Sequence, residues 1–398
     1  MGYGEDEMKK FILALSIMLL GVSSLTFAQG AKEGSNEKAN EVSVENSAEL
    51  KEEVQMVSIT DDNGYVTEVM VNPKRVVTTD IYPLPSVLTV FLDSPEVLVG
   101  IHPVSMSAAK TGLLGQLYPS YLDIDTSFMT GSDLNVGQLM LLNPDVVLYS
   151  ASKPAEGDMI RNAGMKAIAV SATKWNYDVL ETYRQWTGLF GKLFPDHGTE
   201  VAQEVDAYSI KIKNMIDERT SILSDAAKRQ VLFLFLYNDK KMITSGKSFF
   251  GQWWADAVGA KNIAESIKID NSNAVITMEQ VYTWNPDVVF ITNFTSALPE
   301  DLYTNAIGND DWSSIKAVQN NEVYKLPLGS YRSYTPGVDT PVTLLWMAKS
   351  VYPSLFEDIN IVEETRSYYK DIYGITLKDE QINTMYNSVR DASKGYVQ

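Results

Sequence analysis

The chain has 398 residues, of which 45% are hydrophobic, no cysteine and a formal net charge of -18. The lack of cysteine excludes disulfides, thiolate nucleophiles, cysteine-ligated zinc and iron–sulfur clusters. The acidity argues against nucleic acid as a partner, because phosphate binding needs clustered Lys and Arg, and a chain of this length can bury one large core or two.

The N-terminal region has the pattern of a secretory signal. A basic pair precedes the apolar run Phe11–Val22, which is short for a membrane span, and small residues follow as far as Ala28. This pattern predicts a signal peptide over residues 1–29, with residues 1–7 as an upstream extension. An uncleaved membrane anchor is the alternative reading.

Residues 30–56 are polar, rich in Glu and poor in aromatic side chains. Such a segment buries too little apolar surface to order itself, so we expect a flexible acidic leader. Because no cysteine follows the apolar run, no lipid anchor on cysteine is possible. We therefore expect a free protein in the periplasm.

The following residues, 57–175, predict a first α/β lobe. An Asn63-Gly64 pair between strand-like runs is a strong hairpin signal. Short apolar strands then alternate with helical stretches, as in a parallel sheet covered by helices. The expected strands are 75–79, 97–101, 146–149 and 166–170.

Residues 176–225 have apolar side chains at helical spacing on both sides of Pro195. This pattern predicts a helix, a break and a second long helix that leads into the next lobe. A second α/β lobe is expected over residues 226–398. A helical connection resists twisting, so we expect little motion between the lobes.

One segment of the first lobe recurs in the second. Gly137–Leu148 and Glu279–Phe290 both contain a helix-like run, then Asn-Pro-Asp-Val-Val and an apolar strand. Proline restricts the preceding residue to extended conformations, so Asn143 and Asn285 are expected to end their helices in that form. The recurrence predicts two related Rossmann-like lobes with parallel sheets, joined by a long backbone helix, with a ligand cleft between them.

Signatures of several enzyme classes are absent from the sequence. Thr244–Ser248 shares only Gly-Lys-Ser with a phosphate-binding loop, and there is no HExxH zinc motif and no GxSxG elbow. His102 and His197 are too few for a His-rich metal site. We therefore expect no enzyme activity and no cofactor, and the sequence leaves open whether a metal is bound directly.

Ligands of open parallel sheets gather beyond the carboxyl ends of the strands. Segments 150–153 and 292–295 are therefore cleft candidates, together with the loop 329–334. Tyr and carboxylate oxygens suit ferric iron, while Arg and Lys suit anionic chelates. Structural roles remain open for each candidate: sheet-edge packing for the tyrosines, a turn for the histidine and a solvated position for the lysine. The expected ligand-binding residues are Tyr82, His102, Lys153, Tyr237, Asn293, Tyr331, Arg332 and Tyr334.

The order of the segments resembles the helical-backbone class of ABC-transporter substrate-binding proteins, which includes binders of ferric siderophores, haem and vitamin B12. The resemblance covers about residues 57–385, and its motifs are specific for fold and role but weak for the ligand. They are Asp62-Asn63-Gly64 before Pro73–Val77, both Asn-Pro-Asp-Val-Val strands, Gly259–Ala264, Trp312–Val318, Asn321–Tyr324, Trp346–Ala348 and Tyr352-Pro353.

In that class each lobe usually presents a surface glutamate to arginines of the membrane permease. Glu279 matches the position in the second lobe. The position in the first lobe is Gly137, which puts symmetrical docking in doubt, and the nearby Asp133 is a possible substitute.

The resemblance implies a monomeric periplasmic protein that captures an iron chelate and delivers it to an inner-membrane ABC permease with its ATPase. The alternative ligands are haem, a corrinoid, another metal chelate and an oxyanion. A secreted sensory or adhesion module on the same fold is the alternative outside transport.

Overall fold

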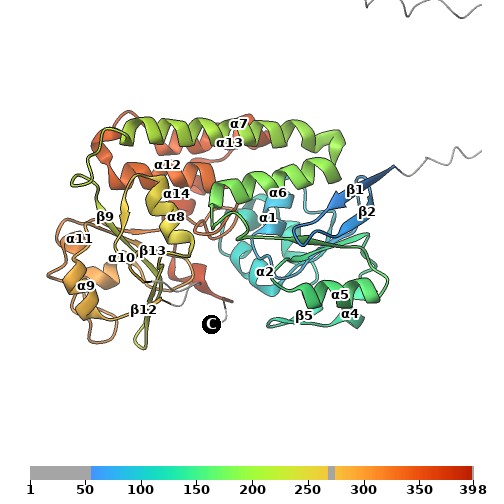
Figure 1. Ribbon diagram of the computed structural model, residues 1–398, viewed down its shortest axis with the longest axis horizontal. Helices are drawn as coiled ribbons and strands as arrows, with labels where there is room; N and C mark the ends of the chain where they lie inside the picture. Colours follow the sequence, from blue (N-terminus) through green and yellow to red (C-terminus); the bar gives the residue numbers. More distant parts are fainter. Residues whose placement is uncertain (1–54, 268–273, 397–398) are drawn as a thin grey trace, which may run out of the picture. The chain divides into compact units, whose positions relative to one another are not determined.

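The computed structural model describes residues 55–267 and 274–396 (Figure 1). The expected signal peptide and the leader up to residue 54 lie outside the described residues. No helix in the described part of the chain is long and apolar enough to cross a membrane.

The N-terminal lobe begins with a hairpin and continues as a parallel sheet. Strands β1 (Met56–Thr60) and β2 (Val66–Met70) pair antiparallel, and Gly64 in the turn has a φ of 84°. Only glycine takes this conformation without a steric cost, which explains the Asn-Gly signal. The sheet then has the order β4-β3-β7-β8, with every neighbouring pair parallel. Its strands are β3 (Val76–Thr78), β4 (Leu98–Gly100), β7 (Val146–Ser150) and β8 (Ala167–Val170).

The helices of this lobe connect and cover the strands (Figure 1). The helices are α1 (Leu84–Phe91), α2 (Pro103–Ala109), α3 (Leu113–Leu117), α4 (Val136–Leu141) and α5 (Pro154–Asn162), with the 3-10 turn η1 (Pro119–Asp123). Between η1 and α4 in the sequence, strands β5 (Met129–Thr130) and β6 (Asp133–Leu134) form a short antiparallel pair.

The sheet of the C-terminal lobe is mixed rather than parallel. Its order is β12-β10-β9-β13-β14, with β11 also paired to β9. The expectation of a parallel sheet holds for β9, β11, β13 and β14 but fails for β10 and β12. Strand β10 follows β9 after a tight turn, and so short a connection permits only antiparallel pairing. The strands are β9 (Gln230–Tyr237), β10 (Met242–Thr244), β11 (Lys261–Asn262), β12 (Ala274–Ile276), β13 (Val288–Ile291) and β14 (Val323–Lys325).

The two Asn-Pro-Asp segments make equivalent contacts in the two sheets. The Asp145 N–H donates to the Arg75 carbonyl at 2.8 Å, and its carboxylate accepts from the Arg75 N–H at 2.9 Å. Asp287 makes the same pair of hydrogen bonds with Gln230, both at 2.9 Å. Each aspartate therefore fixes the start of the central parallel pair in its sheet.

Asn143 and Asn285 end their helices as predicted, but the extended backbone expected for them is wrong. Their φ values are 43° and 46°, in the left-handed region. Asn adopts this conformation more readily than most residues, and a left-handed residue is a common helix terminator. The Asn285 side chain also accepts the Lys316 N–H at 2.9 Å.

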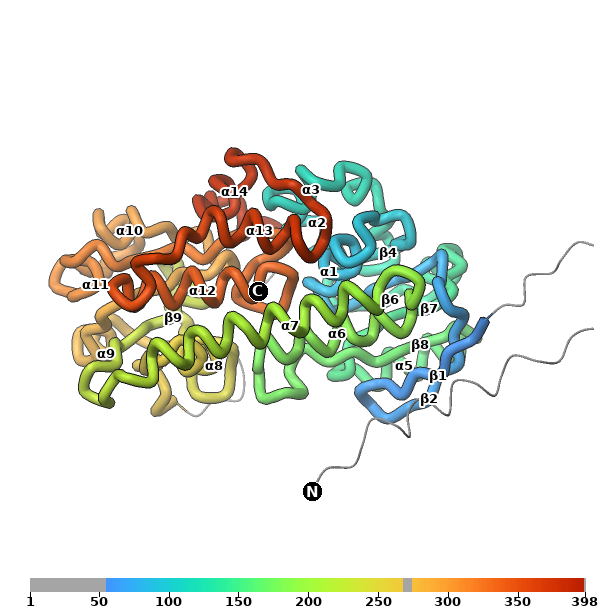
Figure 2. Tube along the Cα trace, turned by 90° about the horizontal axis from the view of Figure 1, so that it is seen from above, coloured from blue at the N-terminus to red at the C-terminus, as the bar shows by residue number. Residues whose placement is uncertain are grey.

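Two long helices connect the sheets. Helix α6 (Val179–Leu193) and helix α7 (Pro195–Thr220) meet at Pro195, where the sequence predicts a break. Helix α7 passes from α6, beside the N-terminal sheet, to α8 and α12 beside the other sheet (Figure 2). Its buried residues include Val201, Val205, Ile212 and Ile216. The predicted two-lobed α/β fold with a long connecting helix is confirmed.

The remaining helices pack on both lobes. Side chains of α13 and α14, among them Tyr368, Tyr369, Ile382 and Met385, lie in the same hydrophobic core as the N-terminal sheet. The division at residues 57–175, 176–225 and 226–398 therefore stays a prediction, because the chain returns to the first lobe after completing the second. These helices are α8 (Phe250–Ala257), α9 (Met278–Trp284), α10 (Pro299–Tyr303), α11 (Lys316–Gln319), α12 (Thr340–Val351), α13 (Ile361–Tyr373) and α14 (Asp379–Tyr386), with η2 (Pro353–Leu355) and η3 (Arg390–Ser393).

Candidate functional site

The loop after β14 is held in place by a buried aspartate. The Asp339 carboxylate accepts from the Ser330 N–H at 2.7 Å and from its hydroxyl at 2.8 Å, and Tyr369 donates to the other oxygen. Burial raises the pKa of Asp339. A Cβ on Gly329 would lie 2.3 Å from this carboxylate, so only glycine fits there. The loop therefore has a defined path up to Arg332.

Arg332 is fully buried and uses all three nitrogens of its guanidinium. Nε donates to the carbonyls of Asn293 at 3.2 Å and Ala392 at 2.9 Å. Nη1 donates to the Tyr331 hydroxyl at 3.1 Å, and Nη2 donates to the Ser107 hydroxyl at 3.4 Å and the Lys394 carbonyl at 3.0 Å. All five of these acceptors are uncharged.

Aromatic rings surround the guanidinium. Its central carbon lies 5.5 Å from the ring centre of Phe294, 5.3 Å from that of Tyr331 and 6.0 Å from that of Tyr396. Arg332 thus combines ring contacts with hydrogen bonds from all three guanidinium nitrogens. We call Asn293, Phe294, Tyr331 and Arg332 the arginine half-site.

A second polar group lies at the strand ends of the N-terminal sheet. Lys153 Nζ is 2.7 Å from Asp80 Oδ2 and donates to the Ser132 carbonyl at 3.0 Å. Glu156 Oε2 lies 3.7 Å from the same Nζ, and Glu156 Oε1 is buried without a hydrogen-bond partner in the described residues. Burial raises the pKa of Glu156.

His102 and Tyr82 complete this group. His102 Nδ1 accepts the Val104 N–H at 3.0 Å, so Nε2 carries the proton and donates to the Gly131 carbonyl at 2.9 Å. Burial lowers the pKa of His102, which keeps the ring neutral at pH 7. The Tyr82 ring lies 4.5 Å from the His102 ring. We call Asp80, Tyr82, His102, Lys153 and Glu156 the lysine half-site.

The two half-sites belong to one region. Tyr82 packs against the aromatic core cluster that contains Phe294 and Tyr331. Helix α2, which His102 caps, supplies the Ser107 hydroxyl that contacts Arg332. The two half-sites together contain six of the eight predicted ligand-binding residues. They are Tyr82, His102, Lys153, Asn293, Tyr331 and Arg332.

Tyr237 and Tyr334 belong to neither half-site. Tyr237 points to the opposite face of its sheet, where its hydroxyl donates to Asp310 at 2.8 Å and accepts from Trp312 at 2.9 Å. Regular strand alternation would put Tyr237 on the same face as Phe235, two residues earlier. The irregular pairing between β9 and β10 shifts the register at this point and turns Tyr237 to the other face. Tyr334 lies in the same aromatic core cluster as Phe294 and Tyr331, but its hydroxyl is directed to the Ser245 hydroxyl at 2.6 Å.

The segment 391–396, which we call the covering segment, lies over Arg332. Arg390 anchors its start through a two-pronged ion pair with Asp301, both contacts at 2.6 Å. Carbonyls of Ala392 and Lys394 then accept from Arg332. The Tyr396 ring lies 4.6 Å from the Phe294 ring. In Figure 1 this stretch is the dark red chain beside the letter C.

Sequence reasoning missed several residues of this region. Phe294 directly follows Asn293, so its place after β13 was available from the strand-end argument. Asp80 also follows a predicted strand, and its carboxylate orients Lys153. No local pattern indicates the covering segment, because its position depends on how the chain returns after α14.

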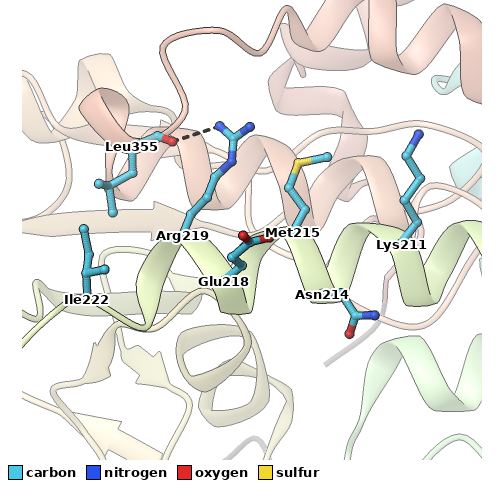
Figure 3. Close-up of a pocket in the computed structure, with 7 residues that line it drawn as sticks. All are labelled: Lys211, Asn214, Met215, Glu218, Arg219, Ile222 and Leu355. Atoms are coloured by element: carbon cyan, nitrogen blue, oxygen red, sulfur yellow. Dashed lines mark hydrogen bonds between the residues drawn. The ribbon is translucent and has the colours of Figure 1, made fainter.

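A hollow of about 800 Å³ lies elsewhere, along helix α7 (Figure 3). Arg219 in this hollow donates to the Leu355 carbonyl at 2.9 Å and forms an ion pair with Asp358. No residue that follows a strand end lines it, so it lacks the converging groups of the two half-sites. Its lining residues are Lys211, Asn214, Met215, Glu218, Arg219, Ile222 and Leu355.

The predicted docking residue Glu279 is exposed in the first turn of α9. Gly137 is exposed at the equivalent position of α4, next to the exposed side chains of Met140 and Leu141. The described residues contain no cluster of three or more His, Asp and Glu side chains placed to hold a metal ion.

Comparison with known proteins decides the family. Residues 104–328, more than half of the chain, match the family model described as periplasmic binding protein. The chain belongs to the periplasmic binding protein family. The resemblance inferred from the motifs is thereby confirmed, and the protein is a solute-binding protein of the ABC-transport class.

This binding protein is similar to relatives with different named ligands. It is 22% identical to the molybdate-binding protein MolA of Haemophilus influenzae, over 74% of this chain and 84% of the relative. It is 25% identical to the Fe(3+)-citrate-binding protein YfmC of Bacillus subtilis, over 67% of this chain and 76% of the relative. The crystal structure of a periplasmic solute binding protein from Veillonella parvula matches with a TM-score of 0.73 and 26% identity, covering 84% of this chain and 97% of that one.

Proposed function

We propose that this protein captures an anionic ferric chelate of the siderophore kind and delivers it to an ABC permease in the inner membrane. The observation that carries this proposal is Arg332, a fully buried guanidinium whose five acceptors are all uncharged. A buried charge is costly unless an opposite charge compensates it. An anionic ligand supplies that charge.

The surroundings of Arg332 favour a chelate with flat or aromatic parts. The rings of Phe294 and Tyr331 lie within about 6 Å of the guanidinium, where they can also contact a ligand ring. Across the region, Lys153 is half-exposed, and its Nζ is free to exchange the Asp80 contact for a ligand oxygen. A chelate that presents carboxylate or catecholate oxygens to both cations fits this arrangement.

An oxyanion is the second candidate, and one observation favours it. A relative of this chain is named as molybdate-binding, and a forked guanidinium suits a tetrahedral oxyanion as well as a carboxylate. The Fe(3+)-citrate-binding relative supports the first candidate by the same kind of similarity.

The ligand proposal is tested by titration of the purified protein without its first 29 residues. Ferric citrate, a ferric catecholate, haem, cobalamin and molybdate are added in turn while Trp fluorescence and heat are recorded. We expect a ferric chelate to bind with a Kd on the order of micromolar or tighter, about -8 kcal/mol, and the iron-free chelators serve as controls. Binding of molybdate or cobalamin with no response to any iron complex would overturn the ferric proposal.

The proposal also covers docking and location. Glu279 lies exposed at the first turn of α9, where a permease arginine can reach it. Gly137 at the equivalent place offers no charge, so we propose that docking relies on the second lobe, with Asp133 near the first. Export through residues 1–29 would place the protein in the periplasm. We propose that it acts there as a monomer.

A further inference from the structure

The covering segment has contacts that resemble those of a bound ligand. Two of its carbonyls, from Ala392 and Lys394, accept from Arg332 at 2.9 and 3.0 Å. Its Tyr396 ring lies edge-on to Phe294 with the centres 4.6 Å apart and edge-on to Phe235 at 6.3 Å. One stretch of the chain thus presents oxygen acceptors to the guanidinium and a phenol ring to the aromatic cluster.

The segment also bridges to the other lobe. A Cβ on Gly395 would lie 2.4 Å from the Ser107 Cβ on α2, so the backbone approaches that helix closely. Gly395 has a φ of 76°, a conformation that glycine adopts without strain. After this turn the Tyr396 ring lies 6.0 Å from the central carbon of the Arg332 guanidinium.

The attachment of the segment is uneven along its length. Arg390 is fixed to Asp301 by two contacts of 2.6 Å and donates to the Ser296 carbonyl at 3.2 Å. Beyond it, the Asp391, Lys394 and Gly395 positions are exposed, and only the Ala392 side chain is buried. The stretch after Arg390 can therefore lift while its base stays fixed.

We propose that residues 391–396 are a built-in competitor, which occupies the ligand position at Arg332 and is displaced when the anionic ligand binds. This inference rests on the proposed function, since the displacing group is the anion of the chelate. A charged oxygen makes stronger hydrogen bonds to a guanidinium than a peptide carbonyl does, so the ligand prevails over the segment. The segment meanwhile keeps the guanidinium hydrogen-bonded when no ligand is present.

The main test compares the full chain with a chain that ends at Arg390, which retains the ion pair to Asp301. A competitor that is closed about nine-tenths of the time lowers the apparent affinity about tenfold. We therefore expect ferric citrate to bind the shortened chain about tenfold more tightly in a fluorescence titration. Far-UV circular dichroism and the Tm check that the shortened chain is folded, and Tyr396→Ala in the full chain gives a second, milder variant with a smaller gain.

Displacement itself is measured by cysteine labelling, because the natural chain has no cysteine. Ala392→Cys places a thiol at a buried position, and Lys394→Cys places one at an exposed position of the same segment as the matched control. We expect ferric citrate to accelerate the reaction of the Ala392→Cys variant with a thiol reagent severalfold and to leave the control unchanged. Adding Arg332→Met to the Ala392→Cys variant should accelerate its labelling without any ligand, because this change removes the donors that hold the segment.

The outcomes separate the two proposals. The competitor proposal is refuted if the shortened chain binds ferric citrate no more tightly than the full chain. It is also refuted if ferric citrate binds and leaves the labelling rate unchanged. In either case Tyr396 is a fixed residue lining the site. Failure of both chains to bind any of the ferric chelates refutes the proposed function, and the competitor role at such a ligand falls with it.

Discussion

Replacing Arg332 by Met tests whether the arginine half-site holds the ligand. The substitution keeps most of the apolar volume of the side chain and removes the charge together with five hydrogen bonds of 2.9 to 3.4 Å. Ligand binding and folding stability respond to different parts of this change, so both are measured.

The expected loss in affinity follows from the hydrogen bonds that an anion would form. A hydrogen bond to a charged group contributes roughly 1.5–3 kcal/mol, so losing the fork to a chelate oxygen weakens binding about ten- to a hundredfold. In the full chain the loss of affinity is partly offset, because the covering segment also loses its hydrogen bonds to Arg332 and competes less with the ligand. The chain that ends at Arg390 shows the whole effect.

The expected change in stability is smaller than five lost hydrogen bonds suggest. Removing the guanidinium also removes a buried charge, whose desolvation opposes folding by several kcal/mol. The two contributions have opposite signs, and we expect the free energy of unfolding to change by no more than about 2 kcal/mol. Urea unfolding monitored by circular dichroism measures this change.

Arg75→Met is the matched control. Arg75 donates to the carbonyls of Leu142 and Asn143, at the start of β3 and so at the opposite end of the sheet from the lysine half-site. We expect it to change stability and leave the Kd for a ferric chelate within about twofold. If Arg332→Met, folded by circular dichroism, binds the chelate as tightly as Arg75→Met does, the arginine half-site is not the ligand site.

Three further predictions concern positions outside the arginine half-site. Glu279→Ala should leave chelate binding unchanged and impair the uptake of labelled iron by cells. The control Glu300→Ala, at an exposed first-turn position of α10, should change neither binding nor uptake. Equal uptake by the two variants would contradict the docking proposal. Tyr237→Phe should lower the free energy of unfolding by about 1–2 kcal/mol through its lost hydrogen bonds and leave the Kd unchanged, and a weakened Kd would return Tyr237 to the site. Burial lowers the pKa of Lys325 to about 7 from its usual 10.5, so between these pH values the unfolded chain holds a proton that the folded chain lacks. The free energy of unfolding of the wild-type chain should therefore rise with pH from about 7 to 10.5 relative to that of Lys325→Met. If urea unfolding gives the same difference between the two chains at every pH in this range, Lys325 stays charged in the folded protein.

The sequence by itself determined the local elements and the duplication. Val146–Ser150 and Val288–Ile291 are buried on both faces, so their composition alone marks them as internal strands. Asparagine before proline ended both preceding helices, although the backbone conformation at Asn143 and Asn285 is left-handed rather than extended. Position after a strand was enough to bring Lys153, Asn293 and Tyr82 into the region of the two half-sites.

Side-chain direction was decided by the tertiary structure. Tyr237 also follows the strand-end rule, but the irregular pairing of β9 with β10 breaks the strand alternation and turns it toward Trp312 on the other face. The antiparallel pairing of β10 follows from its tight turn after β9, whereas β12 joins β10 only after α8 and β11, along a path that no periodicity encodes.

Only the tertiary structure shows that Arg332 is buried among neutral acceptors and covered by residues 391–396. Its partners come from positions as far apart as Ser107 and Lys394, near opposite ends of the described chain. Contacts of this kind arise when helices α13 and α14 return to the first lobe and lead the chain back over the second. A sequence pattern reports the neighbours of a residue along the chain, whereas the charge environment of Arg332 is set by neighbours in space.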